Sequence, residues 1–223
     1  MPVGHPEFNA AFELPADLDP HLAYPVARLW TDLNDMLPGV LEAIPDELVE
    51  ALRSGRWDEW RAQATNWFDE LSENDERAGW DNLYDAVSWS GARTLDMGYL
   101  AAPPQILLWR SGETVTLSWD TRDGRIDDVL CWLESQGSLR LPVTQFLAEV
   151  EDFRARLDAA MRQRMQEVAA LNFLDAAALT DLERQHQVTL SGEGRHPENV
   201  DWDVVFKAIR QLEGWSGMYL IPQ

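Results

Sequence analysis

The spacing of apolar side chains changes twice along this 223-residue chain, and this change constrains the fold more than any other feature. Before residue 99, apolar residues recur every three or four positions, as Trp57, Trp60 and Ala64 do, which is typical of amphipathic helices. From residue 105, Val115 and Leu117 alternate with polar residues, as in a half-buried strand. Helical spacing returns after residue 142. The sequence therefore predicts an α+β fold that is mainly helical, with a small antiparallel β-meander packed against several helices.

Proline, glycine and polar clusters set the expected bounds of the elements. Pro38-Gly39 is expected to end the first helix, with residues 40–44 adding one further turn before Pro45, and Ser111-Gly112 is expected to turn a β-hairpin. The expected helices cover residues 25–38, 45–53, 56–72, 80–87, 142–170, 176–186 and a last segment from 199 or 201 to about 213. The expected strands cover residues 105–110, 113–119, 129–134, 138–141 and 187–190.

Two parts of the chain are expected to be organised separately. Residues 1–23 are rich in proline and predict an arm on the surface. Residues 24–223 predict a single domain that is helical over 24–98, forms the meander over 105–141 and is helical again over 142–223. We expect the helices to pack against one face of the meander.

Acidic side chains outnumber basic ones by 39 to 18, which gives a formal net charge of −21. This potential repels nucleic-acid backbones and anionic lipid, and it steers a cationic protein toward the chain. No segment approaches the roughly 20 apolar residues that span a bilayer. Because a secretory leader pattern is missing and Cys131 is the single cysteine, we expect a cytoplasmic protein without a disulfide. A second interpretation is that the acidity only keeps the chain soluble.

Exposed acids in the N-terminal half are the expected partner-binding residues. They are Asp58, Glu59, Asp69, Glu70, Glu73, Asp75 and Glu76. The chain is also rich in tryptophan, with 11 residues. Tryptophan is favoured at binding hot spots but also in cores, and the helical spacing of Trp57 and Trp60 favours the core.

A second candidate is a polar site formed by Arg93, Asp96 and Tyr99, which lie close together in a glycine-containing segment. The alternative is an Arg–Asp pair that holds the loop where the chain enters the sheet. No other pattern predicts catalysis, a cofactor or a metal. The four histidines are scattered, the aspartates after residue 119 lack the order of a calcium loop, and Cys131 lies in an apolar strand segment, which indicates a buried thiol.

Four blocks of the sequence resemble a bacterial family known only as a domain of unknown function. They are Tyr24–Leu48, Trp89–Leu100, Gln105–Asp123 and Leu141–Met165, so the resemblance covers about residues 24–170 and leaves the tail outside it. Members of that family usually begin with a β-rich segment, whereas residues 1–23 are short and rich in proline. The resemblance implies no activity and no catalytic residue.

Three functions are compatible with these observations. The first is an immunity or antitoxin protein that neutralises a cognate, basic toxin domain by protein–protein binding, which fits the acidity and the absence of a catalytic motif. The likeness in size and acidity to immunity proteins is an analogy. The second is an enzyme with a polar site around Arg93, Asp96 and Tyr99. The third is a housekeeping scaffold or a self-associating regulator.

Overall fold

The computed structural model describes residues 26–70, 87–98, 100–132, 134–171, 174–192 and 200–216. The helices are α2 (Val26–Leu41), α3 (Asp46–Ser54), α4 (Arg56–Glu70), a 3-10 turn η1 (Gly91–Arg93), α6 (Val143–Ala170), α7 (Ala176–Ser191) and α8 (Trp202–Ser216). The strands are β1 (Thr94–Leu95), β2 (Gln105–Ser111), β3 (Thr114–Asp120), β4 (Arg125–Ile126), β5 (Val129–Leu130) and β6 (Gln136–Pro142). The expected mainly helical α+β fold is confirmed. The expected N-terminal surface segment, residues 1–23, lies outside the described residues, as do residues 80–86 of the expected short helix.

The main sheet is antiparallel, with the strand order β1-β2-β3-β6. The expected hairpin forms the pair β2–β3, and Gly112 takes a positive φ of 55° in its turn, which glycine adopts at little cost. The meander prediction was wrong at the third strand, because β5 pairs with β4 in a separate two-stranded sheet. Asp127 and Asp128 form the two-residue turn of that small hairpin, both with positive φ.

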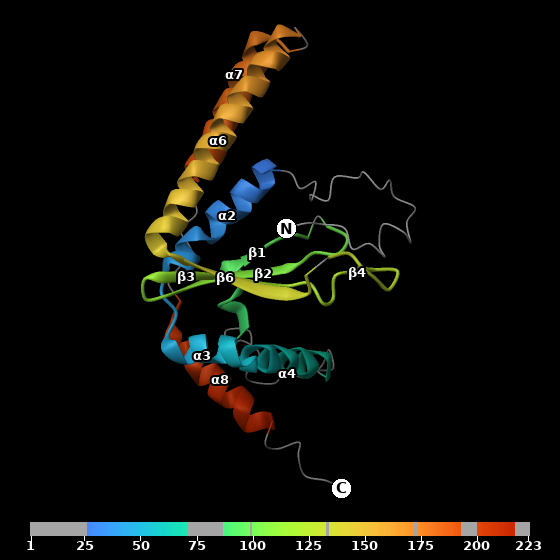
Figure 1. Ribbon diagram of the computed structural model, residues 1–223, viewed down its shortest axis with the longest axis vertical. Helices are drawn as coiled ribbons and strands as arrows, with labels where there is room; N and C mark the ends of the chain where they lie inside the picture. The colour runs from blue at the N-terminus through green and yellow to red at the C-terminus, as the bar shows by residue number, and fades with distance from the viewer. Residues whose placement is uncertain are drawn as a thin grey trace.

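Helices cover both faces of the sheet, so the expectation that they share one face was wrong (Figure 1). The reason lies in β2, where Ile106 and Leu108 face one side and Leu107 and Trp109 face the other. A strand that is apolar on both faces requires a cover on each. The sheet is therefore the middle layer of three.

The layer on the first face holds α2, α6 and α7 (Figure 1). Trp30 of α2 is 2% exposed and its indole N–H donates to the carbonyl oxygen of Thr189 at 2.9 Å. This contact lies in the segment that was expected to be a strand over 187–190, but α7 continues through it to Ser191. Helices α6 and α7 form an antiparallel hairpin that projects beyond the sheet (Figure 1). We call this hairpin the arm.

The layer on the second face holds α3, α4 and α8 (Figure 1). Trp57 and Trp60 of α4 are buried with Trp89, whose ring lies 4.8 Å from that of Trp57 between centroids. The predicted core role of these tryptophans is confirmed. Gly39, which has no Cβ, lets α2 approach η1 closely. A Cβ at this position would lie 2.8 Å from the carbonyl oxygen of Ala92.

Helix α2 does not end at Pro38-Gly39 as predicted but continues to Leu41. Proline removes one backbone donor from a helix interior and favours a kink there. The extra turn buries Val40 completely between the helix and the sheet, and this burial favours continuing the helix past the proline. Among the described residues, no helix has both the length and the hydropathy needed to cross a membrane.

Candidate functional site

A polar cleft of about 610 Å³ lies on the second face of the sheet. Helices α3 and α4 pack over Leu107 and Trp109 of β2, whereas the residues of β6 on the same face, Gln136, Ser138 and Arg140, are exposed. Thr116, which is 7% exposed, and the half-buried Ser118 of β3 line the cleft, in line with their alternation with the apolar residues of β3. The side chains around the opening come mainly from α3, α4, β2, β3 and β6: Arg53, Trp57, Asp58, Arg61, Gln105, Trp109, Thr116, Ser118, Asp120, Arg122, Gln136, Ser138 and Arg140.

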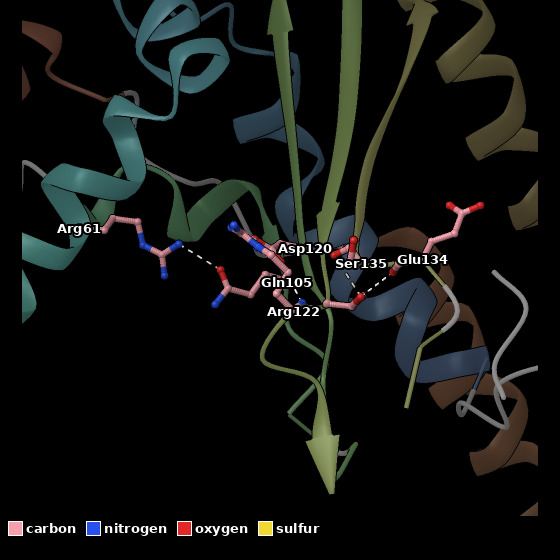
Figure 2. Close-up of polar contacts among 7 residues, drawn as sticks. Arg61, Gln105, Asp120, Arg122, Glu134 and Ser135 are labelled. Atoms are coloured by element: carbon pink, nitrogen blue, oxygen red, sulfur yellow. Dashed lines mark hydrogen bonds and ion pairs between the residues drawn. The ribbon is translucent and has the colours of Figure 1, made fainter. Parts of the chain in front are cut away.

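The cleft has the opposite charge balance to the whole chain, since four arginines and two aspartates line it. Arg61 extends from α4 toward the start of β2, where its Nη1 donates to Oε1 of Gln105 at 3.1 Å (Figure 2). Arg140 is exposed on β6. Neither of these two guanidinium groups forms an ion pair with any residue that the structure describes. The cleft therefore offers two arginines outside ion pairs with described residues, against one such carboxylate, that of Asp58.

One end of the cleft is electrically balanced by Asp120 and Arg122. The Nε of Arg122 lies 3.0 Å from each carboxylate oxygen of Asp120, and Nη2 completes a fork (Figure 2). The hydrogen bond from Arg122 holds the pKa of Asp120 below its ordinary value. Asp120 in turn raises the pKa of Arg122, with a smaller contribution from Asp58. Both groups of the fork are therefore charged at neutral pH.

Thr121 fixes the position of this fork at the end of β3. The residue is 1% exposed, its Oγ1 donates to the carbonyl oxygen of Glu134 at 2.5 Å, and its N–H donates to that of Ser135 at 2.7 Å. Figure 2 shows Glu134 and Ser135 beside the residues of the fork. Because these bonds join the end of β3 to the chain entering β6, they hold the end of the cleft in place.

The expected acidic partner-binding residues are described only in part. Asp58 and Glu59 are exposed in the first turn of α4, and Asp46 and Glu47 are exposed in the first turn of α3. None of these four carboxylates forms an ion pair with a described residue. Their position at helix N-termini is favourable to the helix dipole. We call these four residues the α3–α4 carboxylates.

The remaining expected acids add little to this picture. Asp69 and Glu70 are the last residues of α4, and the structure describes only their backbone. Glu73, Asp75 and Glu76 lie outside the described residues. Neighbouring Trp57 and Trp60, at 3% and 7% exposure, are too deeply buried to contact a partner as anchors.

The second predicted site does not form around Arg93 and Asp96. Arg93 is fully buried; its Nη2 donates to Oε2 of Glu42 at 2.7 Å and its Nη1 donates to the carbonyl oxygen of Trp89 at 2.9 Å. Asp96 is exposed and lies 3.5 Å from Nη2 of Arg28 instead. Tyr99 is outside the described residues. The loop is thus held by a buried arginine as the alternative predicted, but its partner is Glu42 and not Asp96.

The described residues contain no group of three or more histidine, cysteine, aspartate or glutamate side chains that fits a metal ion. The aspartates after residue 119 divide between the fork of Asp120 and the turn of Asp127 and Asp128. Cys131 is 6% exposed, and burial raises the pKa of its thiol. The predicted buried thiol is confirmed.

Comparison with known proteins shows that the chain belongs to a family of unknown function, DUF5984, whose model matches residues 5–208. The match is longer than the expected 24–170, so most of the N-terminal segment and of the tail also belong to the family region. No curated protein and no solved structure matches the chain.

Proposed function

We propose that this protein acts by binding another protein, and that its partner is a basic toxin that it neutralises as bacterial immunity proteins do. One observation carries the proposal: Asp46, Glu47, Asp58 and Glu59, all on helices of the layer on the second face, are exposed without ion pairs to described residues. Since salt screens charges over about 8 Å at physiological ionic strength, uncompensated exposed groups act most strongly on an approaching protein. The α3–α4 carboxylates therefore favour a cationic partner.

The arm provides the contrast that makes this charge distribution informative. Four acids of α6 pair with arginines one turn away: Glu151 with Arg154, Asp152 with Arg156, Asp158 with Arg162, and Glu167 with Arg164. Such pairs cancel most of their field at a distance. Most acids of α6 are thus compensated, whereas the α3–α4 carboxylates have no ion pair with a described residue, which supports a partner-selecting role for the latter.

The class of partner that best fits the α3–α4 carboxylates is a toxin that acts on nucleic acid. A nuclease or deaminase must attract a phosphate backbone, so its working surface is positive. An acidic protein that docks on that surface competes with the substrate electrostatically. An immunity protein of this kind acts where the toxin would damage its producer, so we propose that the protein works in the cytoplasm.

The experiment compares two double variants with the same change in net charge. Asp58→Asn with Glu59→Gln removes two of the α3–α4 carboxylates, whereas Glu151→Gln with Asp152→Asn removes two compensated acids of the arm. Each is co-expressed with the toxin candidates encoded beside the gene, and growth and co-purification at low and elevated salt are measured. We expect the wild type and the arm variant to rescue growth and to retain a basic protein that salt releases.

The α4 variant should rescue growth poorly and retain less partner, although it folds as the wild type does by circular dichroism. Equal rescue by both double variants would show that total charge, and not this face, matters. Failure of the wild type to protect against any neighbouring toxin, or capture of a partner that is not basic, would contradict the proposed function.

A further inference from the structure

The outer edge of β6 is a seven-residue strand edge without a partner among the described residues. The opposite edge of the sheet, β1, has only two residues. An open edge presents unpaired N–H and C=O groups that can pair with another strand, and proteins usually shorten, charge or cover such edges. Only Arg140 places a charged side chain on β6. This edge is therefore long and weakly protected.

Two hydrogen bonds fix which residues of β6 direct their backbone outward. The N–H of Thr121 donates to the carbonyl oxygen of Ser135, and the N–H of Val143 donates to that of Glu113. In an antiparallel ladder, pairs that exchange hydrogen bonds alternate with pairs that do not. Together with the register, the two bonds assign the odd-numbered residues of β6 to β3. The N–H and C=O groups of Gln136, Ser138 and Arg140 therefore point away from the sheet.

The side chains of these same three residues line the polar cleft. All three are exposed, and they lie opposite Asp120, Ser118 and Thr116 in the register. Directly opposed residues of an antiparallel pair have their side chains on the same face. A strand added to β6 would thus send every second side chain into the cleft, where Arg140 and Arg61 have no ion pair with a described residue.

The intervening side chains of an added strand would meet a different surface. Leu139 lies on the first face of the sheet, is 50% exposed, and is followed two residues later by the half-buried Leu141. Apolar side chains of an added strand would cover this exposed leucine. The strand that complements both faces of β6 therefore alternates carboxylate side chains, which face the cleft, with apolar side chains, which face Leu139.

We propose that β6 receives an extended segment of a partner protein as an additional antiparallel strand, with carboxylates facing the cleft and apolar side chains facing Leu139. The antiparallel direction follows that of the existing sheet and of its more stable hydrogen-bond pattern. The excess of acids elsewhere does not prevent this. Salt screens their field over about 8 Å, whereas the arginines of the cleft would contact the added strand directly. The inference goes beyond the proposed function, since it requires no toxin and uses a surface of opposite charge.

The test uses the full-length protein and a fluorescein-labelled, end-capped peptide of alternating valine and glutamate, with a valine–lysine peptide as its match. Fluorescence anisotropy measures binding. We expect the glutamate peptide to bind at least about tenfold more tightly than the lysine peptide. Equal affinity of the two peptides, or no binding of the glutamate peptide up to roughly 1 mM, would overturn the proposal.

N-methylation of the peptide tests the hydrogen bonds without changing the protein. In the proposed pairing, the residues whose side chains face the cleft are those whose N–H groups face β6. Methylating the amides of the glutamates should therefore weaken binding by about tenfold or more, while methylating those of the valines should leave it nearly unchanged. Equal effects of the two methylations would exclude strand addition, and the reverse pattern would exclude the antiparallel direction.

Two charge reversals locate the site on the protein. Arg140→Glu should reverse the preference from the glutamate to the lysine peptide, whereas Arg154→Glu on the arm should leave it unchanged. Loss of the preference in both variants would indicate attraction by total charge and would overturn the assignment to β6. A dimer at assay concentration in sedimentation velocity that Ser138→Pro abolishes would also overturn it, because the edge would then bind a second copy. A variant with Asp46→Asn and Glu47→Gln, two of the α3–α4 carboxylates that do not line the cleft, should keep peptide binding, so this inference and the proposed function can fail separately.

Discussion

Replacing Arg93 with methionine should destabilise the protein by about 3 kcal/mol, because this arginine joins three parts of the fold. Its guanidinium contacts Oε2 of Glu42 at 2.7 Å, and it lies 5.2 Å from the ring centroid of Trp202 and 5.7 Å from that of Trp89. Glu42 follows α2, Trp202 begins α8, and Trp89 precedes η1. Methionine keeps the apolar stem and removes all of these interactions.

The magnitude follows from opposing contributions. A hydrogen bond to a charged group contributes roughly 1.5–3 kcal/mol, and each cation–π contact adds roughly 0.5–2 kcal/mol. Burial of the guanidinium opposes them: it lowers the pKa of Arg93, while the hydrogen bond and the charge of Glu42 raise it. Because Glu42 keeps 24% of its side chain exposed, water partly compensates it when Arg93 is removed. The net loss should therefore lie at the lower end of the roughly 3–5 kcal/mol found when one partner of a buried pair is deleted.

Urea unfolding followed by tryptophan fluorescence measures this loss. The matched control is Arg164→Met, since Arg164 is 73% exposed and pairs with Glu167 at 2.9 Å on the arm; it should change the free energy of unfolding by less than about 1 kcal/mol. A double-mutant cycle of Arg93→Met with Glu42→Gln should give a coupling energy of about 1 kcal/mol or more. An Arg93→Met variant within about 1 kcal/mol of the wild type would refute the reasoning, because burial would then cancel the contacts.

Three further predictions concern other parts of the fold. Gly137→Ala should cost about 1–3 kcal/mol in urea unfolding, since the new Cβ would lie 2.2 Å from Cζ2 of Trp119; Gly91→Ala, whose Cβ meets nothing within 4 Å, is the control, and equal stability of the two variants would contradict the argument. Arg162, and then His186, hold the pKa of Asp158 below its ordinary value, so its stabilising effect on the arm is complete above about pH 4 and lost as the pH falls through the lowered pKa. Hydrogen exchange of the arm against that of β2 and β3 should show this loss at acid pH, and an arm whose protection does not change would contradict it. Cys131 should not react with a thiol reagent at pH 8 until urea unfolds the protein, as thiol titration would show; rapid reaction of the native protein would contradict its burial.

Local patterns predicted the elements whose stability comes from their own amphipathic spacing. The seam of α6 and the alternation of β3 both led to the observed structure. The elements that the sequence did not predict depend on contacts between residues far apart in the chain. The strand β1 has two residues and exists because Thr94 and Leu95 lie in register with Leu107 and Ile106. No local signal predicts so short a strand.

The segment over 187–190 shows the same conflict in reverse. Its Val188, Thr189 and Leu190 have side chains favoured in strands, which suggested one. In the fold, Leu190 is 6% exposed within the first-face core, and the carbonyl oxygen of Thr189 accepts from the indole of Trp30. Burial and this bond support the helix over the local preference, and neither is visible before Trp30 is placed beside α7.

The sequence analysis did not predict the polar cleft because no sequence motif marks it, although one feature of β3 indicated it. The alternation of Thr116 and Ser118 with Val115 and Leu117 already implies that one face of β3 is not a core face. Such a face is normally solvated, whereas in this fold Thr116 is 7% exposed and Ser118 is half-buried in the lining of a cleft that Arg61 of α4 also lines. Thr116 and Ser118 line the cleft beside the exposed side chains of β6, so the cleft and the edge are accessible together, which is the arrangement that recognition of an extended chain needs.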